Sequence, residues 1–223
     1  MKSKLLAFFS ILISFTLWTE ASLTDSPPTV DSVSVSNNEG GAPNPIDLTE
    51  GTTTPVYIFG TITDSNGCLD VYQNGTIEGK FFLSNTPGGA NCNADQNNCY
   101  DISALDCTLS TCDGEGDNNL EYSCTVPVAY FANSTQSGPD IATDWTAKIK
   151  AIDAAFGDGF NQTTTEVNGL LALTFDQQTL NYGSVNMGEL SNEAILNIIN
   201  SGNTGLDVLV SSDNDLICDG EGS

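Results

Sequence analysis

Apolar and polar residues alternate with a period of two through much of this chain. The clearest run covers residues 119–131, where Leu120, Tyr122, Cys124 and the alternate residues after them fall on one face. Such alternation is typical of a β-strand with one buried face. Residues 145–151 show the same pattern, and we expect them to pair with the first run as the last strand of the unit. The Phe-Gly-Asp-Gly motif that follows, residues 156–159, is predicted to be a turn.

Shorter alternating runs precede these two. Their ranges are 33–35, 55–63, 68–72 and 77–83. Asn66-Gly67 and Asn74-Gly75 punctuate them, and Asn and Gly tolerate the positive φ angles that two-residue hairpin turns need. No amphipathic helical run of useful length occurs. The pattern therefore predicts an all-β fold, with an antiparallel sandwich over residues 28–169.

The pattern continues towards the end of the sequence. Residues 196–199 and 206–210 alternate on either side of an Asn- and Gly-rich stretch, 200–205, which predicts a hairpin. A whole sandwich of the immunoglobulin type takes about 100 residues. We therefore expect residues 170–223 to form the N-terminal part of a second, incomplete sandwich.

Residues 171–210 also carry a family-like arrangement. The matching residues are Leu180, Tyr182, Gly183, Val185, Gly188, Asn200, Gly202, Asn203 and Leu206. In these positions the segment resembles the ASH-type, or choice-of-anchor-type, immunoglobulin-like modules of large surface and scaffold proteins. The resemblance implies a non-catalytic β-module and covers no more than these residues. Together with the sandwich predicted before it, we expect tandem immunoglobulin-like sandwiches, the first of them immunoglobulin-like or cadherin-like.

The start of the chain predicts export. Lys2 and Lys4 precede an apolar run over residues 5–18, and small residues at Thr19 and Ala21 suit a signal peptidase. We interpret residues 1–21 as a signal peptide and residues 22–27 as a polar linker. A transmembrane anchor is the alternative, but it needs about 20 apolar residues. The expected location is secreted or cell-surface.

Export makes the seven cysteines interpretable as disulfides. Six of them lie between Cys68 and Cys124, and Cys218 stands apart. Residues 87–119 are rich in Gly, Asn, Asp and Cys and are predicted to be a long loop inserted between strands. The pairings we favour are Cys92–Cys99 and Cys107–Cys112 within the loop and Cys68–Cys124 between two core strands. Zinc binding by Cys92, Cys99, Cys107 and Cys112 is the alternative, although no CxxC pair is present.

The charge and composition exclude several function classes. The net charge is −24 with no histidine, and the basic residues after the predicted signal are Lys80, Lys148 and Lys150. Nucleic acids and acidic membrane surfaces are therefore not expected as partners. Without histidine, the common serine and cysteine nucleophile systems lack their base. We predict no enzyme, and a hydrolase using paired carboxylates is the remaining catalytic alternative.

Two kinds of candidate site remain. Asp113, Glu115 and Asp117 place carboxylates at every second residue, a pattern that suits calcium, which is the one cofactor left open. The glycosylation sequons are at Asn74, Asn133 and Asn161. We expect Asn133 and Asn161, on polar loops, to be modified, and Asn74 to sit in a compact turn.

These observations predict a non-catalytic, secreted or cell-surface structural or adhesion protein. Its expected partner is another cell-surface protein or a glycan. The alternative is a calcium-dependent or carbohydrate-binding accessory module of a larger extracellular enzyme or adhesin.

Overall fold

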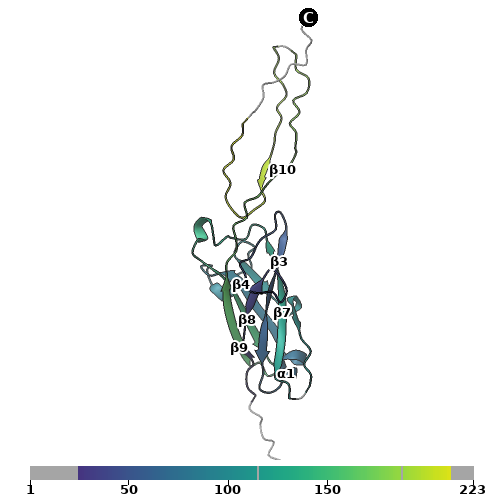
Figure 1. Cartoon of the computed structure of the whole chain (residues 1–223), viewed down its shortest axis with the longest axis vertical. Helices are drawn as coiled ribbons and strands as arrows, with labels where there is room; N and C mark the ends of the chain where they lie inside the picture. Colours follow the sequence, from purple (N-terminus) through teal and green to yellow (C-terminus); the bar gives the residue numbers. More distant parts are fainter. Residues whose placement is uncertain (1–24, 115, 187, 212–223) are drawn as a thin grey trace, which may run out of the picture.

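The computed structural model describes residues 25–114, 116–186 and 188–211. The predicted signal peptide, Glu115 and Cys218 lie outside these ranges. Two antiparallel sheets face each other, and a thin extension projects from one end of them (Figure 1). The prediction of an all-β fold is confirmed. Within the described ranges, no helix has the length and apolar character needed to span a bilayer.

The first sheet is built around two long neighbouring strands. In order, it contains β1 (Thr29–Val30), β3 (Thr53–Thr63), β7 (Asn119–Ala129) and β6 (Cys107–Leu109), and β2 (Ser34–Ser36) also pairs with β3. The second sheet contains β5 (Cys99–Ile102), β4 (Thr76–Leu83), β8 (Trp145–Ile152) and β9 (Asp158–Thr165). Three short 3-10 turns, η1 (Gly89–Asn91), η2 (Ala104–Asp106) and η3 (Gly138–Asp140), lie in the connections.

The core lies between the sheets. Ile58 of β3 and Val126 of β7 are buried on the inner face of the first sheet, and Phe81, Trp145 and Ile149 meet them from the second. Because successive strand residues point to opposite faces, every second residue of β7 and β8 reaches this core. The inward faces predicted from the alternation are those the structure buries.

The predicted pairing of β7 with β8 is wrong. β7 pairs with β3 along its whole length, from Thr53 opposite Ala129 to Thr63 opposite Asn119, whereas β8 pairs with β4 and β9. Alternation identifies the buried face of a strand but not its neighbour, and these two strands cover one core from opposite sheets. The expectation that β8 is the last strand is also wrong, since the polar edge strand β9 follows it.

Residues 68–72 do not form the predicted strand but belong to the helix α1 (Cys68–Asn74). Cys68 and Val71, three positions apart, are its buried residues, which places them on one face of the helix. The helix ends at Gly75, whose N–H donates to the Val71 carbonyl at 3.1 Å. A Cβ on Gly75 would lie 2.2 Å from the Ile152 carbonyl oxygen, so the close approach to β8 requires glycine.

The predicted insert, residues 87–119, is more than a loop. It supplies β5 at the edge of the second sheet and β6 at the edge of the first. Edge strands of three or four residues bury too few side chains to give a clear alternation, which is why the sequence pattern does not show them.

The extension beyond the sandwich contains β10 (Leu173–Phe175) and β11 (Ile198–Asn200), which pair antiparallel. The predicted hairpin between residues 196–199 and 206–210 is wrong, because residues 206–210 form no strand. β11 pairs instead with a segment more than twenty residues before it in the chain. The stretch 200–205 does turn, and it rests against the end of the sandwich.

Candidate functional site

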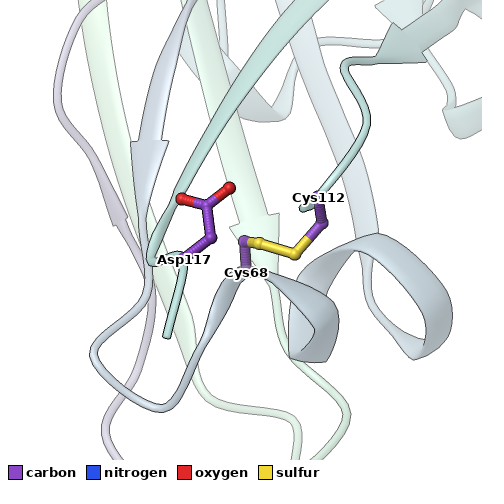
Figure 2. A group of neighbouring side chains, drawn as sticks. All are labelled: Cys68, Cys112 and Asp117. Carbon is purple, nitrogen blue, oxygen red and sulfur yellow. A yellow bond between two sulfur atoms is a disulfide. The ribbon is translucent and has the colours of Figure 1, made fainter. Parts of the chain in front are cut away.

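The disulfides lie at three places along the sandwich, and only Cys68–Cys112 is at the end where β3 stops and β7 begins. Cys92 pairs with Cys99 as predicted, but the other two bridges join Cys68 to Cys112 and Cys107 to Cys124. The predicted pairs Cys68–Cys124 and Cys107–Cys112 are therefore wrong. Cys107 lies directly opposite Cys124 in the pairing of β6 with β7, and Cys68 starts α1 beside the segment that carries Cys112 (Figure 2). Three bridges indicate an oxidising environment.

The predicted calcium loop is only partly described, because Glu115 lies outside the described residues. Asp113 is exposed. Asp117 lies beside the Cys68–Cys112 bridge (Figure 2), and its carboxylate accepts the backbone N–H groups of Asp113 at 3.3 Å and Asn119 at 3.0 Å. This arrangement is typical of an aspartate that stabilises a turn. The sulfur atoms near Asp117 are joined in a disulfide, so they offer no thiolate to a metal.

A second group of carboxylates converges at the same end of the sandwich, and we call it the acidic pole. It consists of Asp25 before β1, Asp64 directly after β3, Asp70 in α1 and Asp153 directly after β8. Carboxylate oxygens of Asp25, Asp70 and Asp153 lie within 4.8 Å of one another. Residues distant in the sequence thus meet because strands of both sheets end here.

Two members of the acidic pole are almost completely buried. Asp64 is 1% exposed and Asp153 is 2% exposed. Asp64 Oδ1 accepts the Asn66 N–H at 2.8 Å, and Asp153 Oδ1 accepts the N–H of Ala155 at 2.9 Å and of Gly157 at 2.7 Å. The Oδ2 atom of each aspartate is buried without a hydrogen-bond partner. The turns therefore fix both side chains and leave one oxygen of each unsatisfied.

The electrostatics of the acidic pole reflect this crowding. Burial raises the pKa of Asp64, and the charges of Asp70 and Asp153 raise it further, against the lowering effect of the Asn66 N–H. Desolvation also raises the pKa of Asp25, followed by the charges of Asp153, Asp70 and Asp64. Asp25 and Asp64 are therefore both exposed to the like charges of their neighbours.

The three lysines of the described chain gather on the outer face of the second sheet. Lys80, Lys148 and Lys150 line one open groove together with Glu78 and Asp101. Lys80 pairs with Asp101, and Lys150 pairs with Glu78 at 2.6 Å. Lys148 Nζ lies 4.1 Å from the centroid of the Phe160 ring. Each lysine thus already has a partner, and this face offers little net positive charge.

The glycosylation sequons differ in accessibility. Asn74 is exposed at the end of α1 rather than in a hairpin turn. Asn133 donates its side-chain N–H to Asp140 at 2.8 Å, and the two residues that complete its sequon are buried. Asn161 lies in β9 and not on a loop as predicted, and it donates its side-chain N–H groups to the carbonyl oxygens of Val30 at 3.0 Å and Asp31 at 3.2 Å. The geometry favours Asn74, the reverse of the expectation from the sequence.

In a host that glycosylates exported chains, we expect Asn74→Gln to remove most of the glycan mass. Asn133→Gln and Asn161→Gln should change it little, because their amide groups are used inside the fold. Intact mass spectrometry before and after enzymatic deglycosylation measures this difference. Glycopeptides at Asn133 or Asn161 with Asn74 unmodified would contradict the assignment.

Comparisons with models of known families, with curated protein sequences and with solved structures find no match to this chain. From its own structure, the chain is classed as a disulfide-bonded, all-β protein with an acidic pole at one end of its sandwich.

Proposed function

We propose that this chain is part of a non-catalytic structural or adhesion protein of the cell exterior, built from β-modules in series. The disulfides, the all-β fold and the lack of histidine in the sequence support this proposal. The proposed second module is immunoglobulin-like, on its resemblance to the ASH or choice-of-anchor type. The proposed route to the exterior is secretion through the signal peptide.

A catalytic role has little support in the geometry. In the part of the chain that the structure describes, the carboxylates that converge as a group are those of the acidic pole, and two of the four are almost completely buried. Other carboxylates do line open grooves, Glu39 and Glu121 in one and Glu78 with Asp101 in another. In the second groove Glu78 is paired with Lys150 and Asp101 with Lys80. A hydrolase using two carboxylates needs both to face its substrate.

The observation that carries the proposal is the joint between the sandwich and the β10–β11 unit. Asn203 donates its side-chain N–H groups to the carbonyl oxygens of Ala132 at 2.9 Å and Asn168 at 3.1 Å. Its Oδ1 accepts the Leu170 N–H at 2.6 Å. One side chain therefore links the 200–205 turn, residues 168–170 and the end of the sandwich.

Further bonds reinforce the joint at the neighbouring positions. The Ser201 hydroxyl donates to Glu50 at 2.5 Å, and the Ser201 carbonyl accepts the Gly51 N–H at 3.1 Å. A Cβ on Gly202 would lie 2.1 Å from the Leu170 carbonyl oxygen, so only glycine allows this approach. Two units with a small polar interface move relative to one another by default. We infer that these bonds restrict that motion, as a structural array requires.

We expect Asn203→Ala to loosen the joint, because three hydrogen bonds are lost at once. The measurement is the distance distribution between spin labels at Gln162 on β9 and Thr174 on β10, by electron–electron double resonance. Labels attached through non-canonical residues leave the native disulfides intact. The wild-type distribution should be narrow, and the variant distribution at least about twice as wide.

Asn181→Ala is the matched control, because within the described residues the Asn181 side chain bonds only locally, accepting the Gly183 N–H at 2.8 Å. It should leave the distribution unchanged. A wild-type distribution as broad as that of Asn203→Ala would show that the units are not held in line, and the proposed structural role would lose its main support.

A further inference from the structure

The acidic pole contains a combination that proteins seldom leave uncompensated. Four carboxylates lie close enough to act on one another, and two of them have a buried oxygen with no hydrogen-bond partner. Buried polar atoms are almost always satisfied, and an unpaired buried charge is costly. Backbone turns hold both side chains in place, so they cannot simply rotate to water. A positive group is the missing component.

No basic side chain within the described ranges is available for this role. The three lysines found there lie on the outer face of the second sheet, where each has another partner. Protonation could neutralise the carboxylates in an acidic medium, but four protonated carboxyl groups could form only a few hydrogen bonds with one another. A bound cation compensates the charges at neutral pH.

We propose that the acidic pole binds a calcium ion through the carboxylates of Asp25, Asp70 and Asp153, with Asp64 as a further ligand or a close charge partner. The Oδ2 atoms of Asp64 and Asp153 have no hydrogen-bond partner, and no hydrogen bond within the described ranges occupies the carboxylate oxygens of Asp25 or Asp70. Calcium takes six to eight oxygen ligands and tolerates irregular geometry, whereas magnesium retains several waters and needs a near-ideal octahedron. A cluster made largely of carboxylates therefore fits calcium better.

The positions of the ligands give the ion a structural consequence. Asp64 follows a strand of the first sheet, and Asp153 follows a strand of the second. Asp25 belongs to the segment before β1, and the neighbouring Ser26 N–H donates to Asn66 at 2.8 Å. A calcium ion here closes the end of the sandwich and fastens the incoming chain to it. This inference goes beyond the proposed structural role and does not depend on it.

The test uses the whole secreted chain after treatment with a chelator. Titration with calcium chloride, followed by calorimetry, should give one site with a Kd of about 10⁻⁴ M, in the range of extracellular calcium modules. At a calcium concentration of about 10 mM the melting temperature should rise by about 5 °C, because the ion binds the folded state only. Magnesium at the same concentration should produce less than half of that rise.

Asp153→Asn and Asp25→Asn test the ligands. The amide introduced by Asp153→Asn retains an oxygen for the backbone N–H groups of the turn, and Asp25 is exposed, so neither change should prevent folding. Both should weaken calcium binding at least tenfold and abolish most of the thermal shift. In chelator they should melt no lower than wild type, because each removes like-charge repulsion. A purely structural role for these side chains predicts no such dependence on calcium.

Asp113→Asn combined with Asp117→Asn is the control for the general attraction of calcium to an acidic surface. It removes charge from the predicted loop and should leave the Kd and the thermal shift unchanged. The proposal is overturned if wild type shows no calcium-dependent shift, or if Asp25→Asn and Asp153→Asn bind as tightly as wild type. Loss of calcium affinity and of the thermal shift in the Asp113/Asp117 variant would equally overturn the proposal.

Discussion

Replacing Trp145 with alanine should lower the free energy of unfolding of the sandwich by about 3–5 kcal/mol. Trp145 is 0% exposed, and its ring lies 4.8 Å from that of Phe81 and 6.0 Å from that of Tyr100. Its Nε1 donates to the Asn133 carbonyl at 2.9 Å. The change therefore removes a large apolar area, leaves a cavity between the sheets and leaves a carbonyl without its donor. Urea unfolding followed by circular dichroism measures the loss.

Two controls separate these contributions. Trp145→Phe retains much of the ring but loses the hydrogen bond, and it should cost about half as much as the alanine variant. Leu105→Ala should change stability by no more than about 0.5 kcal/mol, since Leu105 is 97% exposed. A Trp145→Ala variant as stable as Leu105→Ala would show that the two sheets do not pack through this residue.

The strand faces could be predicted from the sequence because they depend on local alternation. Leu120, Tyr122 and Cys124 on one strand, and Trp145 and Ile149 on another, are buried as their spacing indicates. Strand pairing depends on residues far apart, and alternation carries no information about it. The pattern therefore does not show that β7 and β8 lie in opposite sheets.

The helix α1 could not be read from its pattern, because seven residues are too few to separate helical from strand periodicity. Cys68 and Val71 are buried in the helix, whereas an alternating strand would place them on opposite faces. The preceding Asn66-Gly67 favours a turn in either case. Short apolar runs of this kind are decided by tertiary packing.

The acidic pole could not be predicted from the sequence either, because its residues are far apart in the chain. Its aspartates are spread from Asp25 to Asp153, and only the meeting of strand ends brings them together. The one local feature that points to this cluster is that Asp64 and Asp153 each directly follow a strand. The predicted calcium loop, by contrast, is inferred from residue spacing alone. In the structure the Asp117 carboxylate accepts two backbone N–H groups of its own turn.

The disulfides give the second large effect, and they also test the pairings directly. The bridges span 44 residues for Cys68–Cys112, 17 for Cys107–Cys124 and 7 for Cys92–Cys99. A crosslink stabilises mainly by restricting the unfolded chain, and longer loops gain more. Replacing both cysteines of a pair with alanine should therefore cost about 4, 3 and 2 kcal/mol respectively.

Double replacement matters because a single change leaves a thiol that can exchange with the other bridges. Urea midpoints, followed through the fluorescence of Trp145, should fall in the order of the three loop lengths. Peptide mapping without reduction should recover Cys107 linked to Cys124, as expected for residues directly opposite in β6 and β7. A peptide linking Cys68 to Cys124 would contradict this register and the placement of β6 at the sheet edge. A larger loss from the Cys92/Cys99 variant than from the Cys68/Cys112 variant would instead mean that native contacts around the short loop outweigh chain entropy.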